Sequence, residues 1–168
     1  MKLQFWSIGK ANEAYVKTGV EDFTKRIKHY FPVTWNILPV PRNAAMLSEM
    51  DLRSREADMI LEWLQKDDHL IVLDEKGKQW DSAGLAHYLQ RCANEGKKNI
   101  VFLIGGAYGL DARILERAQA VWSLSSLTFP HQLVRLILTE QVYRACTILR
   151  NEKYHHGRQP WPELFQSI

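Results

Sequence analysis

The sequence is poor in cysteine and has no long apolar segment, and both shortages exclude classes of protein. Only two cysteines occur in 168 residues, Cys92 and Cys146, and they stand far apart in the chain. Two isolated thiols predict buried side chains in a reducing compartment, not a disulfide framework or a thiolate metal site. No apolar run is long enough to span a bilayer, and no secretory signal pattern opens the chain. We therefore expect a cytoplasmic protein without a membrane partner.

A large excess of charge of one sign is also missing. The formal net charge is +3 and the sequence pI is about 8.9. This weakly basic balance permits nucleic-acid binding but does not by itself predict it. A hydrophobic content of 46% over 168 residues suits one globular domain with a full core. No internal repeat, low-complexity tract or linker divides the chain.

Predicted strands and helices alternate along the chain. Apolar runs and alternation predict strands at 2–8, 33–40, 69–73, 99–104 and 120–124. Helical periodicity predicts helices at 13–31, 51–65, 82–95, 112–118 and 133–149. Asn12 is predicted to cap the first helix, residues 42–50 to form a loop, and residues 74–80 a turn. The alternation predicts an α/β fold with a mainly parallel sheet and helices on its faces.

The last predicted helix is apolar on more than one face. Leu133, Leu136 and Ile137 belong to its main stripe, but Val134 and Leu138 fall outside it. A helix of this kind is either deeply buried or shared with a second subunit. It is followed by a short polar tail that carries Tyr154, His155 and His156.

Three predicted strand ends carry residues suited to binding a ligand. They are Leu73-Asp74-Glu75, Gly105-Gly106-Ala107-Tyr108-Gly109 and Leu124-Ser125-Ser126-Leu127-Thr128. Ligands of open parallel sheets bind at the carboxyl ends of the strands, and glycine lets the backbone approach them closely. A tight turn between strand and helix would also explain one of the glycines. Because Leu110-Asp111 follows the last glycine where a phosphate loop needs Lys-Ser/Thr, a nucleotide hydrolase is disfavoured.

The tail histidines do not predict a metal site. His155 and His156 are neighbours and point in different directions on any regular element, and no Cys, Asp or Glu stands at ligand spacing around them. We expect no metal. Taken alone, the two histidines are better explained by a frayed chain end than by a site.

Several segments of the chain form a specific combination of motifs. They are LIGGAYGL (103–110), WSLSSLTFPHQLVRLILTEQVYRA (122–145) and NEKYHH (151–156), with KLQFWSIGK at the start and VLDEKGKQWDS in the middle. Together they resemble the RlmH (YbeA-type) family of small methyltransferases in the SPOUT superfamily. The resemblance covers residues 1–156, which we expect to form one domain, with 157–168 as a C-terminal extension. The chain departs from the family pattern at Lys153, where proline is usual, and in this extension.

The resemblance implies a fold and an activity. The fold would be a SPOUT-type α/β fold with a trefoil knot, a feature that periodicity cannot predict because knots are nearly absent from proteins. The methyl donor would be S-adenosylmethionine, and the acceptor the N3 atom of a pseudouridine in helix 69 of 23S rRNA within the 70S ribosome. The family acts as a homodimer, which would account for the wide apolar surface of the last helix.

The resemblance also implies site residues. Those expected around the cofactor are Leu73, Gly105, Leu124, Ser125, Ser126, Leu127, Thr128 and Phe129. Those expected to be catalytic are Arg144, Tyr154 and His155. We hypothesise that His155 or a water held by the tail accepts the N3 proton, since imidazole suits proton transfer near neutrality. Tyr154 would orient the base, and Arg135 or Arg144 would hold a phosphate or the imide carbonyl.

Two other functions stay open at this point. A non-catalytic module for RNA binding or ribosome assembly would bind RNA without the cofactor, and the glycine-rich loop argues against it. A methyltransferase of the same superfamily acting on another nucleotide is the second alternative, which the Tyr154-His155 tail disfavours.

Overall fold

The computed structural model describes residues 1–157, so the predicted extension lies, apart from Gly157, outside the described residues. The strands are β1 (Lys2–Ile8), β2 (Val33–Leu38), β3 (His69–Gln79), β4 (Asn99–Ile104) and β5 (Ala120–Ser123). The helices are α1 (Ala14–Ile27), α2 (Glu49–Trp63), α3 (Ser82–Asn94), α4 (Ala112–Arg117) and α5 (His131–Leu149), with a short 3-10 helix, η1, at Ala44–Met46.

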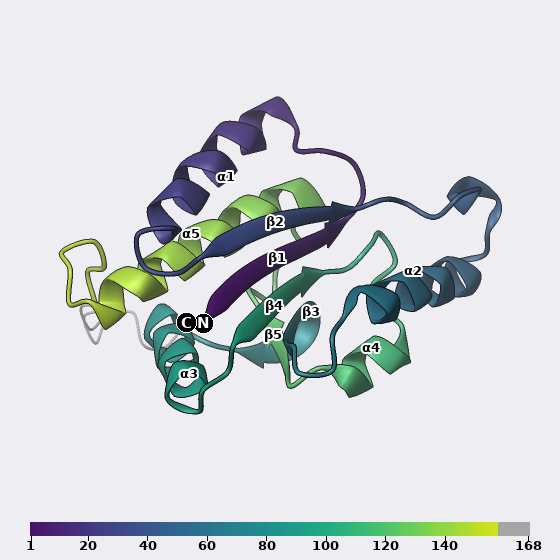
Figure 1. Ribbon diagram of the computed structural model, residues 1–168. Helices are drawn as coiled ribbons and strands as arrows, with labels where there is room; N and C mark the ends of the chain where they lie inside the picture. Colours follow the sequence, from purple (N-terminus) through teal and green to yellow (C-terminus); the bar gives the residue numbers. More distant parts are fainter. Residues whose placement is uncertain (158–168) are drawn as a thin grey trace, which may run out of the picture.

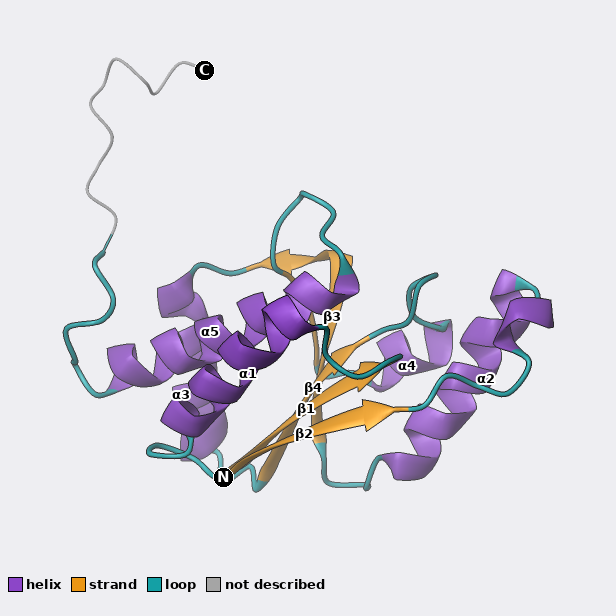
Figure 2. Cartoon of the chain, turned by 90° about the horizontal axis from the view of Figure 1, so that it is seen from above, coloured by secondary structure: helices purple, strands orange, loops and turns teal. Residues whose placement is uncertain are grey.

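All strands pair in parallel, in the order β2-β1-β4-β3-β5 (Figure 1). Helices α1, α3 and α5 cover one face of the sheet and α2 and α4 cover the other (Figure 2). The predicted α/β fold with a parallel sheet and helices on both faces is therefore confirmed. The trefoil knot stays a prediction from the resemblance.

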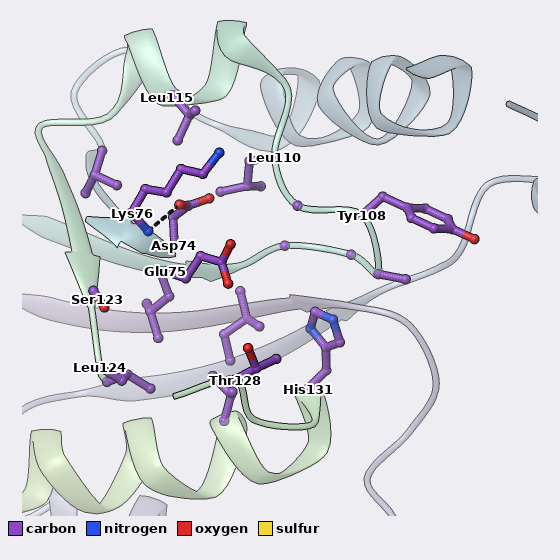
Figure 3. A pocket seen from close by; sticks show the side chains of 18 of the residues that line it. Asp74, Glu75, Lys76, Tyr108, Leu110, Leu115, Ser123, Leu124, Thr128 and His131 are labelled. Atoms are coloured by element: carbon purple, nitrogen blue, oxygen red, sulfur yellow. Dashed lines mark hydrogen bonds between the residues drawn. The ribbon is translucent and has the colours of Figure 1, made fainter. Parts of the chain in front are cut away.

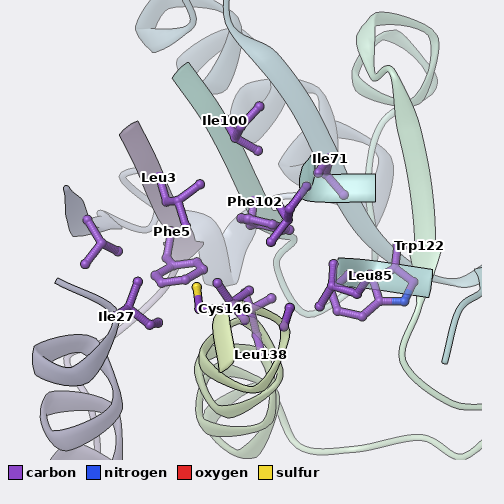
Figure 4. Packing of buried hydrophobic residues seen from close by; sticks show 14 of the residues in the cluster. Leu3, Phe5, Ile27, Ile71, Leu85, Ile100, Phe102, Trp122, Leu138 and Cys146 are labelled. Carbon is purple, nitrogen blue, oxygen red and sulfur yellow. The ribbon is translucent and has the colours of Figure 1, made fainter. Parts of the chain in front are cut away.

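The sheet forms because its central strands bury both faces. Residues Ile100 to Ile104 of β4 are all buried, as expected for a continuous apolar run inside a parallel sheet. One apolar cluster fills the space under α1, α3 and α5, and a second lies under α2 and α4. Figure 4 shows Phe5 and Phe102 of the sheet facing Leu138 and Cys146 of α5. Both cysteines are free and buried, as the sequence predicts.

Helix α5 packs between α1 and α3. One of its 19 residues, Arg135, is a fully buried arginine. No helix in residues 1–157 combines the length and the apolar character needed to cross a membrane.

Three local predictions were wrong. Residues 74–79 continue β3 and do not form a turn, because Lys78 and Gln79 pair with β5 after a register shift that follows Leu73. Helix α2 begins at Glu49 inside the predicted loop, since the Ser48 hydroxyl accepts a hydrogen bond from the Asp51 amide.

Asn12 does not cap the first helix. The N-cap position is Glu13, which makes no side-chain capping bond. The Asn12 side chain instead accepts a hydrogen bond from Arg135 at 3.0 Å. The Asn12 oxygen that was predicted to cap the helix therefore accepts from a buried guanidinium on α5.

Candidate functional site

The carboxyl ends of β4 and β5 and the middle of β3 open into one cavity of about 930 Å³ (Figure 3). Its walls are the β3 segment that follows the start of the register shift (73–76), the glycine loop (105–109) with residues 110–112 and 115, and residues 121–125 and 127–129. Met50 and Arg53 of α2 and His131 and Val134 of α5 complete the lining, together with Ile104 at the end of β4. A cavity of this size is typical of a small-molecule site.

Most residues predicted to surround a cofactor meet at this cavity. The lining contains Leu73, Gly105, Leu124, Ser125, Leu127, Thr128 and Phe129. Ser126 belongs to the same loop but is not among the lining residues. The three segments singled out in the sequence therefore converge. Leu73 lies inside β3, but it pairs with Ile104 at the carboxyl end of β4 and so stands at the same edge of the sheet as the ends of β4 and β5.

The glycine loop is shaped by its own turn and by its neighbours. The Gly109 amide donates to the Gly106 carbonyl at 3.2 Å, and Gly109 has φ 81°, a left-handed conformation that favours glycine. A Cβ on Gly106 would lie 2.5 Å from a carboxylate oxygen of Glu56. Glu56 is buried, and burial raises the pKa of its carboxyl group. The absence of a side chain at Gly106 thus lets α2 pack directly against the loop.

The loop between β5 and α5 is also held by local hydrogen bonds. The Ser123 hydroxyl donates to the Ser125 carbonyl at 2.9 Å, and the Leu127 amide donates to the Ser125 hydroxyl at 3.0 Å. These bonds fix the curve of the backbone that forms one wall of the cavity.

The cavity contains both charged and apolar groups. Asp74 accepts a hydrogen bond from the Lys76 amide at 2.9 Å, and Glu75 lies next to it in the lining (Figure 3). Burial, and to a lesser degree Arg135, lowers the pKa of His131, which favours its neutral form. Within residues 1–157, no three His, Cys, Asp or Glu side chains are grouped closely enough to hold a metal ion.

The residues predicted to be catalytic lie elsewhere. In residues 1–157, none of Arg144, Tyr154 and His155 lines the cavity. Arg144 and Tyr154 meet at Glu140, whose Oε1 atom accepts from Arg144 Nε at 3.0 Å and from the Tyr154 hydroxyl at 3.1 Å. Burial and the nearby Glu140 carboxylate raise the pKa of Tyr154. We call Glu140, Arg144 and Tyr154 the tail unit.

His155 and Arg135 occupy different settings. The Nδ1 atom of His155 is buried and has no hydrogen-bond partner among the described residues. Arg135 is 1% exposed and donates to the Ser7 hydroxyl at 3.0 Å and the Lys10 carbonyl at 2.8 Å. Arg135 thus donates inside the fold through Nε and Nη1. Its suggested role in holding a substrate group stays a prediction.

Sequence reasoning missed some of the lining and part of the tail unit. Met50 and Arg53 reach the cavity from α2, and nothing in their local sequence marks them. Glu140 stands four residues before Arg144, a spacing that favours an ion pair on a helix and could have been noticed.

An open parallel sheet with a cavity at its strand ends is typical of α/β proteins that bind a small molecule or cofactor. A family model described as "Predicted SPOUT methyltransferase" matches residues 1–155. A Cytophaga hutchinsonii protein named ribosomal RNA large subunit methyltransferase H is 46% identical over 156 residues, which cover 93% of this chain and 100% of that protein.

Proteins of the same name from other bacteria are similar over comparable lengths. The one from Flavobacterium johnsoniae is 44% identical and that from Desulforamulus reducens 41%, and the alignments cover 93% and 92% of this chain and 99% of each relative. The chain therefore belongs to the SPOUT methyltransferase family, within the RlmH group that its motifs resemble. As a member of this family it is a methyltransferase.

Proposed function

We propose that the protein transfers a methyl group from S-adenosylmethionine to N3 of a pseudouridine in helix 69 of 23S rRNA, on the 70S ribosome in the cytoplasm. The observation that carries this proposal is the cavity at the ends of β4 and β5 and the middle of β3, in a chain of this family. The names of the relatives support large-subunit ribosomal RNA as the substrate class.

The cavity suits the proposed donor. Leu110, Leu115 and Val134 offer apolar surface for an adenine ring, and the loops of Gly105 and Leu124 offer main-chain groups. The Asp74 and Glu75 carboxylates can receive hydroxyl or ammonium groups. When bound there, S-adenosylmethionine supplies an electrophilic methyl group on a cationic sulfur. The protein's part is to hold the acceptor nitrogen in line with that methyl group.

The tail unit offers groups that suit the acceptor. Arg144 is bound to Glu140 through Nε and Nη2, so its Nη1 donors have no hydrogen bond among the described residues and can contact a carbonyl or phosphate. The Tyr154 ring can orient a base by stacking. We propose that the imidazole of His155, or a water beside it, takes the proton that leaves N3 as the nitrogen gains the methyl group.

The separation of the cavity from the tail unit supports a homodimer. Arg144 lies roughly 15 Å along α5 from Val134 of the cavity, at about 1.5 Å per residue. Leu133, Ile137 and Ile148 share the face of Glu140 and Arg144 and are partly exposed. We propose that this face contacts a second copy, and that the tail of each copy serves the cavity of the other.

Transfer of labelled methyl groups to ribosomes that lack the modification tests the proposed function. Separate subunits and free 23S rRNA are assayed alongside. Label at N3 of a helix 69 pseudouridine, on 70S ribosomes, is the expected result. Cofactor binding without label on any of these substrates would point to another RNA. The absence of both cofactor binding and label would contradict a methyltransferase of this kind.

A further inference from the structure

We propose that Glu140 is a positioning residue, which holds Arg144 and Tyr154 as one preformed unit for the acceptor. This inference rests on the proposed function, in which those two side chains act on the RNA. It assigns a role to a carboxylate that reaches the reaction only through its neighbours.

The contacts of Glu140 converge from three side chains. Its Oε1 atom accepts from Arg144 Nε at 3.0 Å, from Arg144 Nη2 at 2.5 Å and from the Tyr154 hydroxyl at 3.1 Å. Its Oε2 atom accepts from Gln141 Nε2 at 2.7 Å. Because hydrogen bonds to a charged acceptor are stronger than neutral ones, this carboxylate is a strong common anchor.

The carboxylate is in turn oriented by a second helix. Gln141 uses its Oε1 atom to accept from the Ser82 hydroxyl of α3 at 2.7 Å. The network therefore runs from α3 through two residues of α5 to the chain beyond α5. The orientation of Glu140 depends on tertiary packing, not on α5 alone.

Arg144 and Tyr154 also contact each other within this unit. The Arg144 guanidinium lies 4.7 Å from the centre of the Tyr154 ring. The same ring makes an edge contact with Tyr143 at a centroid distance of 4.7 Å. Loss of the carboxylate would leave these weaker contacts to define where the guanidinium and the phenol stand.

A pair with the same spacing in α1 shows what is specific to Glu140. Arg26 and Asp22 are also four residues apart, at 3.0 Å, and their side chains are 47% and 49% exposed. The Arg144 and Glu140 side chains are 26% and 19% exposed. Asp22 holds only its arginine among the described residues, whereas Glu140 holds both members of the tail unit. Asp22→Asn is therefore the matched control.

Glu140→Ala and Glu140→Gln test the inference in single-turnover methyl transfer at saturating S-adenosylmethionine. A misplaced catalytic group can cost about 100-fold in rate, so we expect a loss of about 100-fold for Ala and about 10-fold for Gln, which keeps an acceptor oxygen. The Kd for S-adenosylmethionine should stay within about twofold of the wild-type value, because Glu140 does not line the cavity. Asp22→Asn should transfer methyl at the wild-type rate.

A double-mutant cycle shows whether Glu140 acts through its partners. In an Arg144→Ala, Tyr154→Phe background, Glu140→Ala should reduce the rate by less than about twofold further. A full additional loss in that background would overturn the inference, as would a wild-type rate for Glu140→Ala. A rate above wild type would also overturn it, because Glu140 would then restrain the tail in an inactive position.

Amide hydrogen exchange separates this inference from the proposed function. We expect Glu140→Ala to speed exchange in the segment from Asn151 to His156 by about 10-fold or more, and Asp22→Asn to leave it unchanged. Unchanged exchange in Glu140→Ala would overturn the holding role whatever the substrate proves to be. A wild-type protein that methylates no ribosomal RNA would contradict the proposed function, and the exchange rates would still decide whether Glu140 holds the tail.

Discussion

The cavity and the tail unit are built in different ways. The cavity is shaped by main chain, because the ends of β4 and β5, the middle of β3 and two loops converge and glycines let them approach. The tail unit is shaped by side chains, through a carboxylate and a guanidinium on one face of α5 and a phenol from the chain beyond that helix.

This difference predicts opposite responses to substitution. A cavity made of backbone is sensitive to added atoms, because a new side chain has no free space to occupy. A charged cluster is sensitive to removed atoms, because the removal of one side chain leaves the polar group that it contacts without a hydrogen bond. Variants of the two regions should therefore separate folding and cofactor binding from the rate of methyl transfer.

The largest expected effect is that of Gly77→Ala, in β3 directly after the cavity-lining residue Lys76. A Cβ at this position would lie 2.7 Å from the Val121 carbonyl carbon and oxygen, which are backbone atoms of β5. We expect a loss of about 3 kcal/mol in the free energy of unfolding, measured by urea denaturation, since β3 and β5 must move apart. Gly157→Ala, with nothing within 4 Å of the added atom, is the control. Equal stabilities for the two variants would mean that β3 and β5 are not so closely paired.

Arg144→Ala is the corresponding change in the tail unit. We expect methyl transfer to slow by about 100-fold, as for the loss of a residue that contacts the transition state. The Kd for S-adenosylmethionine, measured by calorimetry, should not change. Equal losses in the rate of methyl transfer and in the affinity for S-adenosylmethionine would show that Arg144 belongs to the cofactor site. The proposed division between a cofactor cavity and a separate tail unit would then be wrong.

Arg135→Met tests the buried cation that ties α5 to the β1–α1 loop. Methionine keeps much of the packing volume but leaves the Ser7 hydroxyl, the Lys10 carbonyl and the Asn12 side chain without their donor. We expect a loss of about 2 kcal/mol in the free energy of unfolding. The exposed Lys25→Met should change it by less than about 0.5 kcal/mol. Stability unchanged in Arg135→Met would mean that these hydrogen bonds are replaced by water.

The smallest expected effect is a pH dependence that lies outside both regions. Burial, followed by the charge of Lys97, lowers the pKa of His69, whose Nε2 atom is 2.7 Å from the Tyr88 hydroxyl. As the pH falls below 6.5, the unfolded chain therefore binds a proton before the folded protein does, and stability decreases until the folded pKa is passed. His69→Gln should show a smaller decrease between pH 7.5 and pH 5. An unchanged slope would assign the acid sensitivity to other groups.

The sequence predicted the strands well where they are buried on both faces. Ile100 to Ile104 form a continuous apolar run, and their strand has the predicted bounds. The second half of β3 was missed because Asp74 to Gln79 are polar, and only pairing with β5 makes them a strand. Local pattern carries no information about such a partner.

The candidate site was predictable in part for the same reason. Gly105 and Leu124 follow buried strands directly, so their position at the sheet edge could be inferred. Met50 and Arg53 come from a helix that reaches the cavity only through the packing of α2. The bond from Tyr154 to Glu140 requires the chain to reverse after Asn151, which adopts φ 54°, and no helical spacing encodes that reversal.

The measurement that tests the account most directly is methyl transfer by mixed dimers. One copy carries Gly105→Val, whose Cβ would lie 2.9 Å from the Leu110 side chain in the cavity, and the other carries Arg144→Ala. Each variant alone should be nearly inactive. If the tail of one copy serves the cavity of the other, the mixed dimer has one intact site and should recover about half of the wild-type rate. Mixed dimers as inactive as their parents would contradict the account, because cavity and tail would then have to act within one chain.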